Sequence, residues 1–454
     1  MISKEATSPF YTRLVSNLLF PLHERLKRHD SRSRLHALER SQWLSPAEIT
    51  SLQLANLRAF LRTIATTNPY YRDLFANLNV DPDAIESVDD LARLPLLSKD
   101  EIRKAQAEMI SQNSGRLQQY NTGGSSGEPL IFYMGMDRIS HDVAAKWRAT
   151  RWWNVDIGDV EAVIWGSPVE LGKQDQLKAL RDRLFRSHLI PAFDLRPDSI
   201  RHYLSELQRL RPRMVFGYPS VIHQLTLAAA DQNVNLRNLG TLVVFTTSEM
   251  LYPHQREAIE TAFDAPVANG YGARDAGFIA HQCPAGGLHI SAEDIVVEIV
   301  DADGTLCPPG TAGEIVITHT ATSAFPFVRY RTGDTGRLSD QVCACGRGLP
   351  LLQEVQGRTT DFITATDGAK VHALALIYVI REIEGVDQFK ISQFQPNQVT
   401  VQLKVNSVFD PLSVDRIESG MKARLGADMI IVIEEVCGFP TTANGKFRYV
   451  ESSL

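Results

Sequence analysis

The sequence predicts an α/β protein with a large N-terminal domain, residues 1–360, and a small α+β C-terminal domain, residues 361–454. From about residue 120 onward, short β-type runs alternate with helical stretches, an order typical of α/β proteins. After residue 361 the order becomes helix, strand, strand, helix, strand, which indicates a separate α+β unit. A chain of 454 residues corresponds to about three average domains, and a large domain with a small appendage also fits.

The first 115 residues are expected to be mostly helical. Leu57, Phe60, Leu61 and Ile64 follow the i, i+3, i+4, i+7 spacing of one helix face, and Pro69 ends the pattern. This spacing predicts a helix that packs on the core.

The segment 10–22 is apolar and is followed by a run of basic residues: Arg25, Lys27, Arg28, Arg32 and Arg34. Two interpretations fit this pattern. One is a helix packed on the body of the protein, which we favour. The other is a peripheral helix that lies on an anionic membrane surface.

The middle of the chain shows the alternation most clearly, with a strand expected at 241–246, a helix at 253–263 and a strand at 266–272. Two alternating segments, 295–300 and 314–318, lie on either side of Asp303-Gly304, a hairpin-type dipeptide. An antiparallel element is therefore expected there. In the C-terminal unit, residues 398–405 alternate strictly around Val399, Val401 and Leu403, which predicts a half-buried strand.

The composition is that of an ordinary globular protein, with 44% hydrophobic residues, 22% charged residues and a formal net charge of −6. These values exclude intrinsic disorder, collagen and a coiled coil. A pI near 6.1 and the absence of interleaved basic and aromatic residues argue against nucleic-acid binding. The longest apolar runs, such as 373–380, are far shorter than the roughly 18 residues of a membrane-spanning helix, so no transmembrane segment is expected.

Five cysteines, an odd number, and the absence of a secretory signal pattern make a disulfide framework improbable, so we expect a reducing, cytoplasmic location. The sequence does not determine the oligomeric state, and a homodimer is compatible with it.

Residues 120–129 form a glycine-rich string, YNTGGSSGEP. Three glycines let backbone amides turn toward an anion, and Thr122, Ser125 and Ser126 add hydroxyl donors, which together suit phosphate oxygens. A flexible surface loop would have a similar composition. The string lacks the Gly-Lys-Ser/Thr of a P-loop, so a kinase or GTPase is disfavoured.

Four further strings follow in order: YGARD at 271–275, YRTGD at 330–334, GRTTD at 357–361 and PTTANGKFR at 440–448. Together with the glycine-rich string they resemble the adenylate-forming superfamily of acyl-CoA synthetases, adenylation domains and luciferases. Within it, strings such as NPYYR at 68–72 and FGYPS at 216–220 resemble the phenylacetate-CoA ligase-like branch, particularly members associated with capsular or exopolysaccharide biosynthesis. The resemblance covers essentially the whole chain.

The resemblance implies a nucleotide- and acid-binding N-terminal domain closed by a mobile C-terminal lid. It also implies a two-step reaction, in which ATP activates a carboxylic acid as an acyl-adenylate with release of pyrophosphate, and a thiol then takes the acyl group. CoA is the leading acceptor. The alternatives are transfer to an amine, an amino sugar or a carrier protein in polysaccharide or secondary-metabolite biosynthesis, and a non-enzymatic, nucleotide-binding scaffold of a polysaccharide assembly complex.

The resemblance also implies roles for individual residues. Asp334 would accept hydrogen bonds from the ribose hydroxyls, and Arg358 would reach the ribose and phosphates. Lys446 would stabilise charge on the α-phosphate during acyl attack, and Asp361 would be the hinge of the lid. The loop that would hold the β- and γ-phosphates consists of Thr122, Gly123, Gly124, Ser125, Ser126 and Gly127.

Other positions would shape the nucleotide and acid pockets. Tyr271 would stack beside the adenine, next to Gly272, and Ser248 and Glu249 would line the nucleotide pocket. The acid pocket would be formed by residues near 218–223, 245–250 and 270–278, whose aromatic and small side chains suit an aryl or compact acid.

Asp275 departs from the family, whose members usually carry a glutamate there that helps to bind Mg²⁺. Aspartate is one methylene shorter. Asp275 is therefore either a Mg²⁺ ligand or a purely structural carboxylate.

The cysteines suggest a second site. Cys343 and Cys345 precede a glycine at metal-chelating spacing, and Cys283 with His289 offers the other half of a Cys3His zinc site. Four protein ligands would make this zinc structural rather than catalytic. His281 is the alternative histidine, and free buried cysteines are the alternative interpretation.

Overall fold

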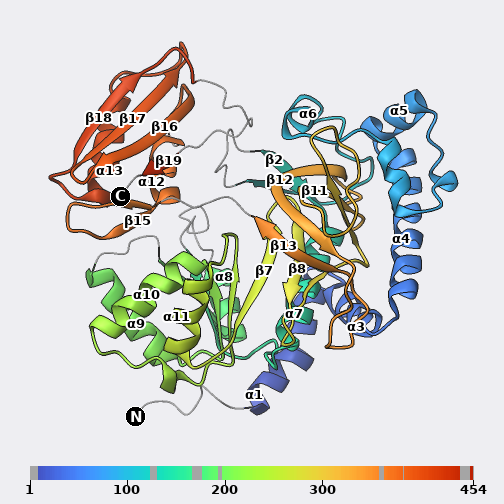
Figure 1. The fold of residues 1–454 in the computed structure, drawn as a ribbon, viewed down its shortest axis with the longest axis horizontal. Helices are drawn as coiled ribbons and strands as arrows, with labels where there is room; N and C mark the ends of the chain where they lie inside the picture. Colours follow the sequence, from blue (N-terminus) through green and yellow to red (C-terminus); the bar gives the residue numbers. More distant parts are fainter. Residues whose placement is uncertain are drawn as a thin grey trace.

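The computed structural model describes residues 9–122, 130–165, 176–192, 197–356, 362–381, 383–439 and 450–452. Within these ranges the chain forms one 11-stranded sheet, one four-stranded sheet and two small hairpins, with helices packed around them (Figure 1). The predicted fold class, a large α/β unit followed by a small α+β unit, is confirmed.

The N-terminal part is helical, as expected. Its helices are α1 (Pro9–Leu14), η2 (Val15–Leu19), α2 (Phe20–Leu26), α3 (Ser31–Ser41), α4 (Pro46–Thr67), α5 (Pro69–Leu78), η3 (Pro82–Ala84), η4 (Val88–Arg93) and α6 (Lys99–Lys104). Helix α4 begins at a capping box, in which Ser45 and Glu48 exchange hydrogen bonds. Its predicted stripe, Leu57 to Ile64, lies in the core.

The first helical segment packs on the body of the protein, as the favoured interpretation required. Val15 and Phe20 are buried against Leu35 and Leu38 of α3. In the described parts of the chain, each helix is too short or too polar to cross a bilayer.

The large sheet has a parallel half and an antiparallel half, in the order β10-β11-β12-β13-β9-β8-β7-β6-β5-β3-β4. The parallel strands are β3 (Glu161–Trp165), β4 (Ser187–Pro191), β5 (Met214–Gly217), β6 (Val243–Thr247) and β7 (Val267–Ala273). The antiparallel strands are β8 (Gly277–Gln282), β9 (Leu288–Ile290), β10 (Ile295–Val300), β11 (Gly313–His319), β12 (Phe327–Ser339) and β13 (Leu351–Gln356).

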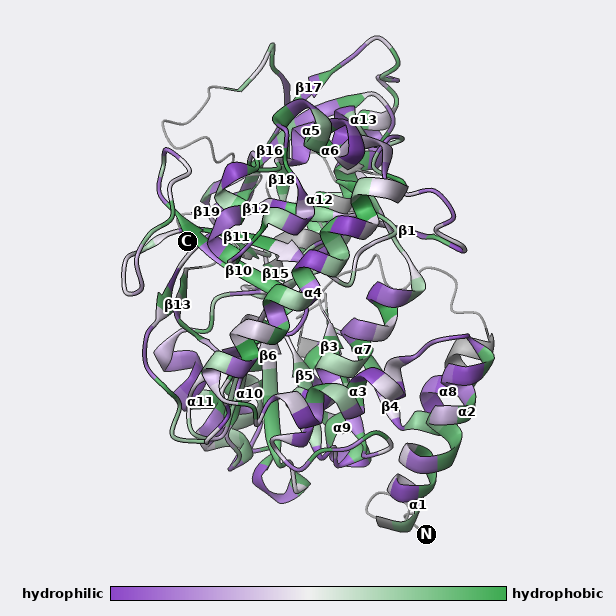
Figure 2. Cartoon of the chain, turned by 90° about the vertical axis from the view of Figure 1, so that its right-hand side faces the viewer, coloured by the Kyte–Doolittle hydropathy of each residue, from purple (hydrophilic) through white to green (hydrophobic). Residues whose placement is uncertain are grey.

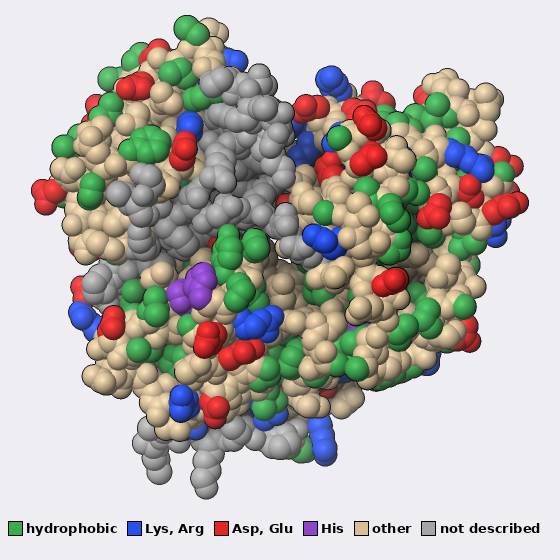
Figure 3. Space-filling model, viewed as in Figure 1, with side chains coloured by type: hydrophobic (Ala, Val, Ile, Leu, Met, Phe, Trp, Pro, Cys, Tyr) green, Lys and Arg blue, Asp and Glu red, His purple; other side chains and the backbone are tan. Residues whose placement is uncertain are grey.

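Helices cover both faces of the parallel half, which explains why every residue of β5 is buried. The helices of this region are α7 (Met136–Arg151), α8 (Gln176–Phe185), α9 (Pro197–Leu210), α10 (Pro219–Asp231), η6 (Arg237–Leu239) and α11 (Pro253–Phe263). Helices α9, α10 and α11 bury apolar side chains on one face, and α7 contributes to the cluster on the other. On the face shown in Figure 3, charged side chains of both signs are scattered among the described residues, in keeping with the small net charge.

The predicted hairpin at Asp303-Gly304 is confirmed. Strands β10 and β11 pair antiparallel, from Ile295 opposite His319 to Val300 opposite Glu314. Asp301 Oδ1 accepts hydrogen bonds from two backbone N–H groups of the turn, and Gly304 has φ +82°.

The C-terminal unit consists of β14 (Phe362–Thr364), β15 (Lys370–His372), α12 (Ala373–Arg381), β16 (Val386–Gln395), β17 (Gln398–Val405), α13 (Ser413–Leu425), β18 (Ile430–Glu435) and β19 (Val450–Ser452). The expected order of helix, strand, strand, helix, strand corresponds to α12 through β18. The short β14–β15 hairpin and β19 were not expected. Val399, Val401 and Leu403 are fully buried in a hydrophobic cluster that draws only on residues 363–450.

Candidate functional site

The predicted nucleotide-pocket residues Ser248 and Glu249 directly follow β6, at the carboxyl edge of the parallel strands, where ligands of open α/β sheets bind. Ser248 is exposed and has φ +71°, a left-handed conformation that is uncommon for a residue with a Cβ. Glu249 Oε2 accepts a hydrogen bond of 3.2 Å from the backbone N–H of Ser220, in the first turn of α10. This hydrogen bond holds the segment that follows β6 next to the connection between β5 and α10.

Tyr271 and Asp334, predicted from separate motifs, lie in contact. The Tyr271 hydroxyl is 3.1 Å from Asp334 Oδ2 and 3.4 Å from Thr332 Oγ1. Burial and the negative charges of Asp334 and Asp275 raise the pKa of Tyr271 well above its usual value, so the phenol stays protonated and donates to Asp334. One carboxylate oxygen of Asp334 is therefore held by Tyr271.

Asp275 lies next to this pair and is only 5% exposed. Its Oδ2 accepts a hydrogen bond from the Tyr330 hydroxyl, and Lys99 Nζ lies 4.0 Å from the same oxygen. Arg138 of α7 donates to the Asp275 backbone carbonyl over 3.3 Å. Tyr330 and Lys99 were not predicted as site residues, and Lys99 brings the N-terminal helical region to this carboxylate.

Thr122 marks the base of the glycine-rich loop. Strands β1 (Gln118–Asn121) and β2 (Ile131–Met134) pair antiparallel, and Thr122 closes the hairpin. Its backbone N–H donates to the Leu130 carbonyl over 3.0 Å, and its Oγ1 accepts from the Leu130 N–H over 2.9 Å. Among the described residues the hydroxyl proton of Thr122 has no acceptor, so it can donate to a ligand.

Several predicted residues lie outside the described residues. They are Gly123, Gly124, Ser125, Ser126 and Gly127 of the loop, Arg358, the hinge residue Asp361, and Lys446. Their roles stay predictions.

Aromatic side chains cluster near the segments expected to form the acid pocket. One of them, Trp165, is the last residue of β3 and was not predicted. The Trp165 ring lies 4.5 Å from the Tyr218 ring and stacks on the Phe216 ring at 6.2 Å. Phe245 lies 6.2 Å from Phe216. Phe216, Tyr218 and Phe245 are buried, and Trp165 is partly exposed, so these rings are mainly core packing at the end of the parallel strands.

The predicted zinc ligands come together. One ligand atom each from Cys283, His289, Cys343 and Cys345 lies within 4.8 Å of the other three. Cys283 Sγ is 3.6 Å from Cys343 Sγ, and Cys345 Sγ is 3.2 Å from His289 Nε2. His281, the alternative histidine, instead stacks on Phe278.

The hydrogen bond and the burial of His289 suit a metal-ligand role. Its Nδ1 is 3.2 Å from the Leu349 carbonyl, which requires the proton on Nδ1 and leaves the Nε2 lone pair toward the cysteines. Burial lowers the pKa of His289 to about 4, so the ring is neutral at physiological pH. These residues fit a tetrahedral zinc site of the Cys3His type.

Two tight turns hold the cysteines. Gly346 N–H donates to the Cys343 carbonyl over 3.2 Å, with φ +82° at Gly346. A Cβ on Gly287 would lie 2.7 Å from Cys343 Sγ, so only glycine fits there. Just beyond, Arg347 packs between Trp43 and Trp152, which joins this loop to the N-terminal helices.

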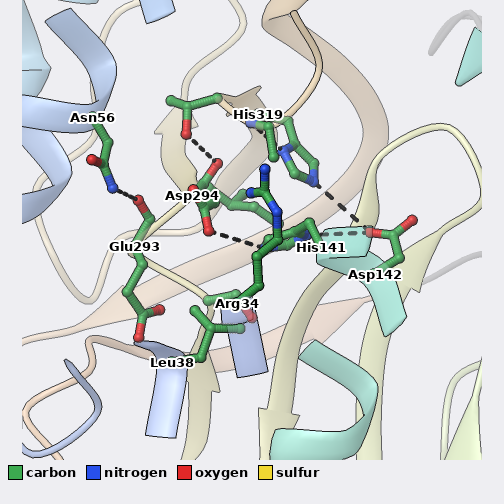
Figure 4. Close-up of polar contacts among 12 residues, drawn as sticks. Arg34, Leu38, Asn56, His141, Asp142, Glu293, Asp294 and His319 are labelled. Carbon is green, nitrogen blue, oxygen red and sulfur yellow. Dashed lines mark hydrogen bonds and ion pairs between the residues drawn. The ribbon is translucent and has the colours of Figure 1, made fainter. Parts of the chain in front are cut away.

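Sequence reasoning missed a buried polar network on α7. Arg148 pairs with Glu293 over 2.6 Å, and both side chains are at most 4% exposed. Figure 4 shows the neighbouring contacts, in which His141 lies 3.4 Å from Asp294 and His319 lies near Asp142.

His141, Asp142 and His319 resemble a metal group, because their ligand atoms lie within 4.8 Å. However, His319 Nδ1 accepts a hydrogen bond of 3.3 Å from the Ala321 N–H. The proton of the neutral ring is then on Nε2 and faces Asp142, so no lone pair is offered there. We interpret this group as a structural network.

Comparisons with known proteins agree with this geometry. The family model described as "AMP-binding enzyme" matches residues 185–324, which include β5, β6 and Tyr271, and that described as "CapK C-terminal domain" matches residues 363–453. The chain belongs to the adenylate-forming superfamily. The predicted resemblance is thereby confirmed.

Several relatives extend over most of this adenylate-forming chain. Protein CapK from Staphylococcus aureus is 23% identical over 411 residues, which cover 90% of each chain. Phenylacetate-coenzyme A ligase from Thermus thermophilus is 23% identical over 328 residues, covering 70% of this chain and 72% of the relative. The chain is thus phenylacetate-CoA ligase-like and also resembles CapK.

Among solved structures, 2-hydroxyisobutyryl-CoA ligase in complex with 2-HIB-AMP and CoA in the thioesterification state superposes with a TM-score of 0.64. It is 19% identical and covers 91% of both chains. The similarity supports the adenylate-forming fold.

Proposed function

We propose that this adenylate-forming ligase activates an aryl or compact carboxylic acid with ATP and Mg²⁺, releases pyrophosphate, and transfers the acyl group to a thiol, with CoA as acceptor. The observation that carries the proposal is the hydrogen bond between Tyr271 and Asp334, which belong to two distant motifs, with the charge of Asp275 close enough to raise the pKa of Tyr271. The reaction would take place in the cytoplasm.

In the first half-reaction, Asp334 accepts hydrogen bonds from the ribose hydroxyls while Tyr271 fixes its orientation. The Oδ1 atom of Asp275 would serve Mg²⁺, which neutralises charge on the phosphates when bound, because Oδ2 is engaged by Tyr330. Lys99 contributes a positive charge at the same carboxylate. The hydroxyl proton of Thr122 and the amides of residues 123–127 would hold the departing pyrophosphate.

Lys446 and Arg358 complete this proposal. Lys446 stabilises the α-phosphate as the acid attacks, and Arg358 binds the ribose and phosphate region. We place the domain boundary at residue 361. Asp361 would be the hinge about which the C-terminal lid rotates between the two half-reactions. The separate cluster of residues 363–450 supports this division.

The first experiment is acid-dependent ATP–pyrophosphate exchange with a panel of aryl, aliphatic and amino acids. Lys446→Ala should reduce exchange by roughly a hundredfold or more, because preorganised charge at the reacting phosphate contributes several kcal/mol. The matched control is Lys422→Ala, which removes a lysine paired with Glu418 on α13 of the same domain. Unchanged exchange in Lys446→Ala would refute the assignment.

The acceptor is tested separately. With the acid identified by exchange, the enzyme is supplied with CoA, with amines and amino sugars, or with a carrier protein, and the acylated product is measured by mass spectrometry. The proposal requires acyl-CoA. Product formed only with an amine or carrier protein would reassign the acceptor while leaving the adenylation step intact.

We also propose that Cys283, His289, Cys343 and Cys345 bind a structural zinc ion. Four protein ligands fill the coordination sphere of zinc and leave no open position for water or substrate, so the ion would be structural rather than catalytic. It would stabilise the Cys343 loop, which packs on the N-terminal helices.

Metal analysis of protein purified without added zinc tests this site. We expect one zinc per chain, lost in Cys343→Ser together with a fall in melting temperature, because zinc binding supplies folding free energy. Cys437→Ser, which changes an exposed cysteine, should retain the metal. Absence of stoichiometric zinc from the unaltered protein would exclude the site.

A further inference from the structure

The first helical segment has a second face that is largely exposed in the described structure. Helical backbone geometry at Leu14 and Phe20 joins α1, η2 and α2 into one continuous run. Opposite the buried Val15 and Phe20, the run exposes large apolar side chains, with exposed fractions of 77% for Phe10, 56% for Leu18, 53% for Leu22 and 77% for Leu26. The three leucines are spaced four residues apart and therefore share one side of the helix.

Helix α8 adds to this surface. Its Leu180 and Leu184 are also four residues apart and are 55% and 41% exposed. The helix lies against the first segment, since the Tyr11 hydroxyl donates to the Leu184 carbonyl and Phe20 contacts Phe185. Figure 2 shows α1, α2 and α8 at the same end of the molecule. Single exposed leucines are ordinary, but grouped ones on adjoining helices indicate a contact surface.

The charge of this region is opposite to that of the whole chain. Residues 9–34 contain six basic residues and two acidic ones, a net charge of +4, whereas the chain carries −6. Of the two acidic side chains, Glu24 is buried and accepts hydrogen bonds within the protein, and Asp30 pairs with Arg34. Arg13, Arg25, Lys27, Arg28 and Arg32 are exposed.

The basic residues also border a hollow. A shallow concavity of about 490 Å³ beside α2 is lined by basic residues and two acidic ones, namely Arg25, Arg28, Arg32, His29, His36, Glu24 and Asp30. Guanidinium groups gathered at a concave surface favour phosphate oxygens, which they bind in a forked geometry. Leu22 and Leu26 belong to the same helix as Arg25, so the apolar and basic parts of the surface adjoin.

We propose that this surface, formed by residues 10–36 with Leu180 and Leu184, binds a bilayer that contains anionic phospholipids. The leucines and Phe10 enter the boundary between headgroups and acyl chains, and the arginines bind the lipid phosphates, which is the arrangement of an interfacial amphipathic helix. A second copy of the chain fits this surface less well, because self-association would bring two basic regions together. The proposal does not depend on the ligase activity.

The test is flotation of the full-length protein with vesicles of phosphatidylglycerol and phosphatidylcholine. The protein should float with mixed vesicles, and much less with phosphatidylcholine alone or at high salt. Arg25→Gln/Arg28→Gln/Arg32→Gln should lower the partition coefficient by roughly a hundredfold, because each basic residue near an anionic surface contributes about a fivefold factor.

A second variant, Leu18→Ser/Leu22→Ser/Leu26→Ser, should also lose flotation. Its matched control is Phe394→Ser/Val408→Ser/Leu412→Ser, which removes exposed apolar residues from the C-terminal unit and should float like the unaltered protein. Circular dichroism establishes that each variant is folded. Equal flotation of the leucine variant and the unaltered protein, or no flotation of the latter, would overturn the proposal. Analytical ultracentrifugation gives a further test. If the unaltered protein is a dimer and Leu18→Ser/Leu22→Ser/Leu26→Ser is a monomer, a second copy of the chain covers this surface and the proposal is overturned.

Discussion

At the scale of single residues, the candidate site depends on hydrogen bonds between side chains from distant motifs. Tyr271 and Asp334 are 63 residues apart in sequence, and their contact is set by strands β7 and β12. Because burial and neighbouring carboxylates raise the pKa of the phenol, Tyr271 is a hydrogen-bond donor throughout the physiological pH range. This donor holds the carboxylate that we assign to the ribose.

Tyr271→Phe tests that contact. We expect kcat/KM for ATP to fall by roughly tenfold or more, because a hydrogen bond to a charged group contributes about 1.5–3 kcal/mol. The melting temperature should change little, since the ring is retained. Tyr11→Phe, which removes a hydroxyl bonded to Leu184 outside the site, is the control. Equal kcat/KM for ATP in Tyr271→Phe and the unaltered protein would contradict the role.

The sequence allowed some site residues to be predicted and others not. The Cys/His spacing and the two motifs ending in Asp275 and Asp334 were visible because their residues form local patterns. Lys99 and Trp165 carry no such pattern, since each is one ordinary residue that only the tertiary fold brings to the site.

At the scale of elements, close packing of β5 constrains the parallel half of the sheet. A Cβ on Gly217 would lie 2.1 Å from the Ile164 carbonyl oxygen of β3. No side-chain rotation relieves a contact with backbone, so the strands would have to move apart. The residue that follows, Tyr218, belongs to the aromatic group of the site.

Gly217→Ala should therefore lower the free energy of unfolding by about 1–3 kcal/mol, the usual cost of overpacking. Denaturant titration measures it. Gly438→Ala is a matched control, because no atom of the described residues lies within 4 Å of its added Cβ. If Gly217→Ala and the unaltered protein have the same free energy of unfolding within experimental error, β5 accommodates the added methyl group without loss of stability.

Element predictions succeeded where side-chain periodicity was clear. The stripe from Leu57 to Ile64 identified α4, and the alternation at 398–405 identified β17. The role of α7 could not be predicted in this way, because its buried face carries polar residues such as Arg138, His141 and Arg148. Their partners, Glu293 among them, are distant in sequence, so periodicity gives no sign of the pairing.

At the scale of the whole molecule, buried histidines make stability depend on pH. Burial and the charge of Arg148 lower the pKa of His281 to about 3, and burial with Arg138 lowers that of His319 well below its usual value. Both rings are neutral in the folded state but take up protons in the unfolded chain below about pH 6.5. Stability from these groups is thus complete above that pH and decreases as the pH falls toward 3.

We expect His281 and His319 to lower the free energy of unfolding by about 2 kcal/mol per pH unit between pH 6 and pH 5, since each takes up a proton only in the unfolded chain. His289, whose pKa burial lowers to about 4, adds to this slope, and urea titration measures the total. His281→Phe should make the slope shallower. His36→Gln, a change at an exposed histidine, should leave it unaltered. A slope of zero over this interval would show that the two buried rings do not control acid sensitivity.

The C-terminal unit has its own hydrophobic cluster, whose described side chains all come from residues 363–450. The clusters of the large sheet share no residue with it. Reorienting one unit as a rigid body would therefore leave the apolar contacts inside each cluster unbroken. The enzyme that we propose could then alternate between its two half-reactions at little energetic cost, with the barrier set by the connecting backbone and by bound substrate rather than by melting of a core.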